Sequence, residues 1–198
     1  MTGLSLALDL SLAGSGEAAP TTEVVTWNGS DSGANIALSG GNLIATSTAG
    51  LAHRSLRATA SRTGKLRKFE ITVGPVGVND AFGIANATAS LSNYLGVDNS
   101  SLGWFSTGAV YLGGVPVATV DTYTNGSIIS FEVNDVADLI YLQKSGGSRS
   151  TGISIAAITG GLFPALDFFA NGSAGTLNAG ATAFTIAANT GFSGWNYV

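Results

Sequence analysis

Apolar and polar residues alternate with a period of two along much of the chain. Residues 68–73 (KFEITV) and 129–134 (ISFEVN) show the pattern most clearly. Successive side chains of a strand point to opposite faces, so each segment predicts a strand with one face in a core and one in water. No segment keeps a 3.6-residue period for more than two turns, and little helix is therefore expected.

Short pairs rich in glycine and asparagine separate the alternating runs and predict chain reversals. These are Asn28-Gly29, Gly40-Gly41-Asn42, Gly113-Gly114, Asn125-Gly126, Gly146-Gly147 and Asn171-Gly172. The pair at 113–114 predicts a hairpin of residues 110–112 and 115–120. Pro116 should lie at a sheet edge or a bulge, because proline has no N–H for a central ladder. The whole pattern predicts an all-β, two-sheet antiparallel sandwich.

The first twenty residues carry a pattern of their own. Leucine recurs at every second position, which places all of these side chains on one face of a strand. The leucines are Leu4, Leu6, Leu8, Leu10 and Leu12. Residues 14–20 (GSGEAAP) then have the composition of a linker. We predict an N-terminal arm and linker over residues 1–20, which binds a partner, and a sandwich over residues 21–198. The alternative is an ordinary first strand packed on the same core.

Composition excludes several classes of protein. The 198 residues suit one domain, and 45% hydrophobic with 10% charged residues favours a folded chain over a disordered one. A net charge of -4 argues against nucleic acid as a partner. No run approaches the roughly 20 apolar residues of a membrane helix, so no membrane insertion is expected. The chain has no cysteine, which excludes disulfides and thiolate metal sites.

The basic residues are unevenly distributed. Six of the eight lie between positions 54 and 68, beside the only histidine, His53. From this cluster we select Arg54 and Arg57 as candidates for binding an acidic neighbour in an assembly. The alternative is a solvated strand-loop-strand region. Tyr94 and Tyr123, near turns, are further candidates for surface contacts, whereas Trp104 and Phe131 are expected in the core.

The inventory of catalytic groups is thin. A Ser-His-Asp arrangement would have to use His53, which lies in the basic run without a nucleophile-elbow motif and is expected to be exposed to solvent. Asp135 and Asp138 lack the spacing of a calcium loop and indicate a polar turn between strands. We therefore expect no catalysis, no cofactor and no metal.

An ordered series of short motifs resembles the SPRY domain family over residues 22 to 195. The motifs are 64–65 (GK), 68–74 (KFEITVG), 82–85 (FGIA), 102–104 (LGW), 125–129 (NGSII), 139–146 (LIYLQKSG) and 162–166 (LFPAL). The resemblance implies a sandwich of two curved antiparallel sheets used for protein recognition. Ser145 departs from the usual asparagine of its turn, and the peptide-contact residues of eukaryotic members are not recognisable, so none is carried over.

Residues 26–28 (TWN) and 36–43 (IALSGGNL) also resemble SPRY-like modules in virion proteins of tailed bacteriophages. That resemblance implies a non-enzymatic structural, decoration or fibre protein of the virion, attached by its arm. Its partners would be other virion proteins and copies of itself, with a host-surface protein or glycan as a further partner. The alternative is a stand-alone module for recognition of a protein or a glycan.

Overall fold

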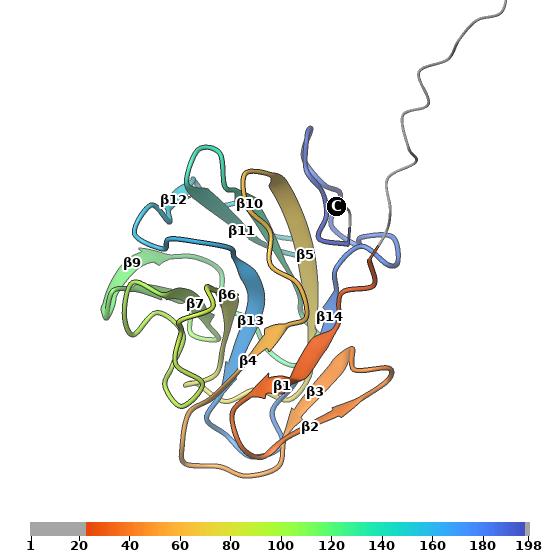
Figure 1. Ribbon diagram of the computed structural model, residues 1–198, viewed down its shortest axis with the longest axis vertical. Coiled ribbons are helices and arrows are strands. Elements are labelled where there is room, and N and C mark those ends of the chain that lie inside the picture. Colours follow the sequence, from red (N-terminus) through yellow and green to blue (C-terminus); the bar gives the residue numbers. More distant parts are fainter. Residues whose placement is uncertain (1–22, 197–198) are drawn as a thin grey trace, which may run out of the picture.

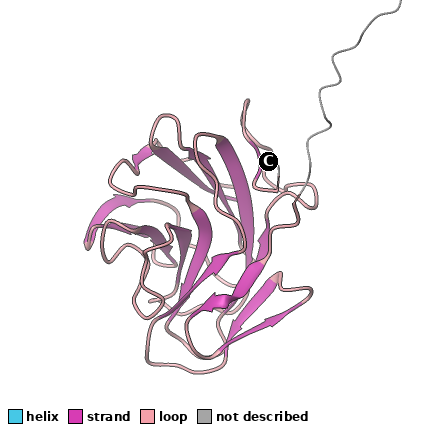
Figure 2. Cartoon of the chain, in the orientation of Figure 1, coloured by secondary structure: helices cyan, strands magenta, loops and turns pink. Residues whose placement is uncertain are grey.

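The computed structural model describes residues 23–196, which contain fifteen strands and no helix (Figure 1, Figure 2). The predicted arm, with its five leucines, lies outside the described residues. Its predicted boundary with the sandwich, at residue 20, also lies outside them. Within residues 23–196, no helix long and apolar enough to cross a membrane is found.

Two sheets face each other in the sandwich. The first sheet has the strand order β1 (Trp27–Ser32), β4 (Arg54–Ala58), β13 (Phe163–Phe168), β6 (Ala81–Ala85), β7 (Ser101–Phe105), β8 (Ala109–Leu112) and β9 (Val115–Thr119). The second has the order β12 (Ile153–Ser154), β11 (Leu139–Lys144), β10 (Ile128–Asn134), β5 (Leu66–Val73), β14 (Ala174–Asn178), β3 (Ile44–Ser47) and β2 (Ile36–Ser39), with β15 (Ser193–Gly194) beside β5. All neighbours are antiparallel except β15 and β5, so the predicted all-β sandwich is confirmed.

The core lies between the sheets, where the period-two pattern of the strands places their large apolar residues. Phe131 of β10 is directly opposite Phe69 of β5, and the two rings stack at 4.6 Å between centroids. Trp104 of β7 reaches across from the first sheet and meets Phe131 edge-on at 5.8 Å. Trp104 and Phe131 are fully buried, as the sequence predicts.

Glycines let two central strands of the first sheet approach closely. Gly83 of β6 is paired with Gly103 of β7. A Cβ atom on Gly83 would lie 1.9 Å from the carbonyl oxygen of Leu102, a distance that no side chain tolerates. Small residues therefore line the outer face of β6, while Phe82 and Ile84 point into the core.

Five of the six predicted reversals are turns in the structure, but Asn28-Gly29 lies inside β1. The side chain of Asn28 accepts a hydrogen bond from the Ser30 N–H at 3.0 Å. This local bond makes an irregularity in the pairing of β1 with β4 rather than a reversal. Pro116 lies on the edge strand β9, next to a shift in register between Val110 and Tyr111, as predicted. Asp135 and Asp138 lie in the turn between β10 and β11, also as predicted.

The faces of β5 and β10 that the sequence predicts to lie in water are largely covered, so that prediction was wrong for both strands. Lys68, Glu70 and Glu132 do point away from the core, but each has less than 4% of its surface exposed. The C-terminal loop, residues 180–192, lies over them. The N–H groups of Thr185 and Ile186 donate to the Glu70 carboxylate at 2.9 and 2.8 Å. Burial can be tolerated here because these charges have both ion-pair and backbone partners.

Candidate binding site

A hollow opens on the outer face of the first sheet, and we call it the aromatic hollow. It has a volume of about 420 Å³ and is lined by His53, Val78, Asn79, Tyr94, Phe105, Thr107, Ala109 and Tyr111. Its position follows from the alternation along the strands. Large residues of β6, β7 and β8 point into the core, which leaves small alanines beneath a second cluster that contains Phe105, Tyr94 and Tyr111.

Three aromatic rings build one wall of the aromatic hollow. The Phe105 and Tyr111 rings are 5.2 Å apart, and Tyr94 lies 6.1 Å from Phe105 and 6.2 Å from Tyr111. All three contacts are edge-to-face, the arrangement that aromatic quadrupoles favour. Val78 stands at the rim with 68% of its surface exposed. The wall is therefore ordered by packing and partly open to a ligand.

The hydrogen-bonding group of the aromatic hollow is His53. Its Nδ1 lies 2.7 Å from Oδ2 of Asp167, a fully buried carboxylate on β13. Oδ1 of the same carboxylate accepts the backbone N–H of Arg54 at 3.0 Å. Burial raises the pKa of Asp167, while the hydrogen bond from His53 acts in the opposite direction.

When Asp167 is ionised it only accepts hydrogen bonds, and Nδ1 of His53 then carries the proton of this contact. The Nε2 atom is then the acceptor that the ring offers to a ligand. The side chain of His53 is 24% exposed, and its ring lies 5.5 Å from Tyr94 and 4.9 Å from Phe169. Asp167 and these rings fix the plane of the imidazole.

The position of His53 differs from the sequence-based expectation of a solvent-exposed residue. The histidine does lie in a loop, just before β4, but it is half-buried and paired. The sequence showed no sign of its partner, because 114 positions separate His53 from Asp167. Strand alternation offered one signal for the site, since Asp167 has the outward parity of β13, between the core residues Leu166 and Phe168.

Of the two tyrosines selected as surface candidates, the structure brings only Tyr94 to a candidate site. Tyr123 is buried, with 2% of its surface exposed, and its hydroxyl donates to the Trp104 carbonyl at 2.7 Å. Burial raises the pKa of Tyr123 well above its ordinary value. Its selection as a contact residue was wrong, because a position near a turn in sequence does not determine the direction of a side chain.

The predicted basic patch is also wrong. Arg54 and Arg57 have 8% and 6% of their surface exposed and serve the fold. The Arg57 guanidinium donates to both oxygens of Asp31 at 2.7 Å and to the Ala89 carbonyl, also at 2.7 Å. Arg54 donates to loop carbonyls, among them that of Ala52 at 2.6 Å. Because guanidinium groups can tie several carbonyls and carboxylates together, a basic run can fasten loops instead of forming a surface.

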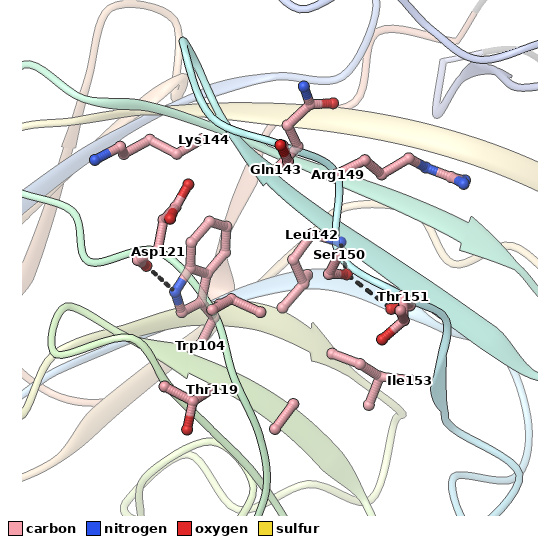
Figure 3. A pocket seen from close by; sticks show the side chains of 13 residues that line it. Trp104, Thr119, Asp121, Leu142, Gln143, Lys144, Arg149, Ser150, Thr151 and Ile153 are labelled. Atoms are coloured by element: carbon pink, nitrogen blue, oxygen red, sulfur yellow. Dashed lines mark hydrogen bonds between the residues drawn. The ribbon is translucent and has the colours of Figure 1, made fainter.

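A second concave feature, which we call the edge groove, lies where the two sheets separate. It consists of two adjoining cavities of about 320 and 380 Å³ that share Ala118, Thr151 and Ile153. Figure 3 shows Trp104, Leu142 and Ile153 inside it, with the Trp104 indole donating to the Asp121 carbonyl at 3.1 Å. The edge strand β9 forms one side of the edge groove, and the segment that leads from β11 to β12 forms the other.

The arrangement of strands, core and surface features is that of a SPRY-like β-sandwich. The SPRY domain of human HERC1 superposes with a TM-score of 0.66, at 14% identity, over 76% of this chain and 96% of that domain. A second human SPRY domain gives 0.60, at 19% identity, over 75% and 98% of the two chains. The PSpry domain of TRIM65 gives 0.64, at 9% identity, over 80% and 93%.

At these identities, the likeness shows the fold that this chain shares with SPRY domains. No protein-family model matches the sequence, and no curated protein sequence matches it. The resemblance to SPRY domains seen in the sequence motifs is thus confirmed at the level of the fold. The virion association that the sequence implied is carried by those motifs alone.

Proposed function

We propose that this chain is a non-enzymatic recognition module that binds a protein partner through the aromatic hollow. The observation that carries the proposal is the aromatic wall beside His53, whose Nδ1 is bonded to Asp167 and whose Nε2 has no hydrogen-bond partner among residues 23–196. Rigid aromatic side chains lose little entropy on binding and anchor protein contacts well. The fold supports the same function, since SPRY domains are widely used for protein recognition.

The Asp167–His53 pair has the same kind of carboxylate–imidazole hydrogen bond that orients the histidine of hydrolytic triads. Such a triad also needs a nucleophile within hydrogen-bond reach of Nε2. Thr107 supplies the only aliphatic hydroxyl among the residues that line the hollow, and no bond joins it to His53 in residues 23–196. A fixed acceptor for a ligand is therefore the role that we assign to His53.

Peptides selected from a random library against the full-length chain test this function. We expect Val78→Asp and Tyr94→Ala each to weaken the binding of the selected peptides about tenfold, because both side chains face the aromatic hollow. Val136→Asp is the matched control, since Val136 is 69% exposed on the turn between β10 and β11. Binding is measured by fluorescence polarisation and folding by thermal melting. The proposal would be contradicted if the peptides bound all variants equally. It would also be contradicted if the chain bound glycans on an array and no peptide from the library.

We further propose that the module belongs to the virion of a tailed bacteriophage and is attached through residues 1–20. Support comes from the phage-like motifs and from the leucine alternation in the arm. Within residues 23–196, the core cluster runs from Val25 to Trp195. The described chain also begins beside its end, with the Glu23 N–H donating to the Asn196 carbonyl at 2.9 Å.

Deletion of residues 1–16 should leave a soluble, folded sandwich that no longer attaches or assembles. The core described above keeps all of its residues in that variant, so its circular dichroism and melting temperature should stay close to those of the full chain. Assembly is followed by light scattering and by incorporation into particles. If the shortened chain unfolds, the arm belongs to the core of the sandwich and the division at residue 20 is wrong.

A further inference from the structure

We propose that the arm of one copy docks as an added strand in the edge groove of a second copy. The inference rests on the proposed function, in which residues 1–20 are the attachment device, and it names both the partner and the surface. The occupant is the segment from Leu4 to Leu12.

The first support is a free sheet edge. Among residues 23–196, β9 pairs only with β8, and Val115 and Val117 have 56% and 42% of their surface exposed. The Val120 N–H donates to the Gly108 carbonyl at 2.9 Å, and the next pair along is Ala109 with Thr119. Hydrogen-bonded and non-bonded pairs alternate in antiparallel strands. Thr119 therefore directs its N–H and C=O away from β8, ready for another strand.

The second support is the match between the edge groove and the arm. A strand added along β9 would place every second side chain over the edge groove, where Trp104, Leu142 and Ile153 form the apolar floor between polar walls (Figure 3). The arm offers a leucine at every second position. Burying each leucine contributes roughly 1.5–3 kcal/mol, so several of them offset the cost of ordering the segment.

Charge supports the same pairing. The arm carries Asp9 on its polar face and has no lysine or arginine. The rim of the edge groove carries Lys144 and Asp121, and also Arg149, whose guanidinium is ion-paired with Glu132 at 2.8 Å. Among residues 23–196, the Lys144 ammonium has one hydrogen-bond partner, the Thr122 carbonyl at 3.0 Å, so it retains donors for a carboxylate.

The length of the linker favours a second copy over the same copy. The described chain begins near β1, and β9 is the opposite edge of that seven-stranded sheet, as Figure 1 shows. Six strand spacings amount to about 29 Å. Residues 13–22 span about 33 Å only when fully extended, and about 18 Å on average as a flexible linker. The groove of a neighbouring copy is therefore reached more easily than the groove of the same chain.

Complementation between two full-length variants tests the inference. Leu6→Asp/Leu8→Asp disables the arm and keeps the groove, whereas Val117→Asp disables the groove and keeps the arm. Each variant alone should be monomeric by sedimentation, because arm-to-groove contacts need both parts. A one-to-one mixture should give a dimer and nothing larger, since only one competent contact remains. Val136→Asp, the exposed control, should assemble like the unchanged chain.

Other outcomes overturn the inference. If the Val117→Asp variant still assembles, the arm does not use this edge. If the mixture stays monomeric although the unchanged chain assembles, the arms pair with one another. If the unchanged chain is monomeric, a second copy is not the partner of the arm. The proposed role of residues 1–20 in attachment is tested separately by the deletion of residues 1–16. That role holds when the deletion prevents attachment to particles, and it fails when attachment survives the deletion.

Discussion

Replacing Glu132 with alanine should lower the free energy of unfolding by about 3–5 kcal/mol. The Glu132 carboxylate lies 3.9 Å from the Lys68 ammonium and 2.8 Å from Nε of Arg149. It also accepts the N–H of Asn189 at 2.8 Å, which fastens the C-terminal loop over β10. Its loss leaves the fully buried Lys68 with one carboxylate within ion-pair distance among residues 23–196, that of Glu70 at 3.8 Å.

Urea unfolding of matched variants measures this effect. Glu132→Gln keeps the size of the side chain, so the difference between glutamine and alanine separates charge from packing. Glu23→Ala breaks an exposed ion pair with Arg62 of 3.1 Å and should cost at most about 1 kcal/mol. Burial lowers the pKa of Lys68, and the two carboxylates oppose that shift. Equal stability of Glu132→Ala and Glu23→Ala would show that the C-terminal loop does not bury these charges in solution.

Phe131→Ala should be about as costly, at roughly 3–5 kcal/mol, because it opens a cavity between the two sheets. The ring of Phe131 stacks on Phe69 within its own sheet and meets Trp104 of the other, so both layers lose contacts. Trp104→Ala should show a similar loss. Val136→Ala, at an exposed turn, should leave the midpoint of urea unfolding unchanged. Near-normal stability of both core variants would mean that the core is misplaced.

The aromatic hollow and the edge groove can serve different contacts because they lie on different parts of the sandwich. The aromatic hollow lies on the outer face of the first sheet, whereas the edge groove lies at the free edge of β9. A module held through its edge groove and through its own arm would keep the hollow accessible. An assembly of this kind can present many copies of one binding site, which raises avidity without a new contact.

The C-terminal loop covers a face that strand alternation alone predicts to be in water. The alternation along β5 and β10 correctly separated the core face from the opposite face. It could not reveal that residues 180–192 return over that opposite face, because Thr185 and Glu70 are 115 positions apart. Partners at this separation leave no periodic signal in a single sequence.

The class of fold, the core and most of the turns could be predicted from the amino-acid sequence alone. These depend on local physics: strand alternation selects which side chains are buried, and glycine with asparagine permits the reversals. The partners of the polar side chains, by contrast, are set by the three-dimensional fold. His53 is oriented by Asp167, Arg57 joins Asp31 of β1 to the turn at Ala89, and Tyr123 turns its hydroxyl into the core. The physical reason is that a polar side chain follows whichever partner satisfies it, and the chain fold alone brings those partners together.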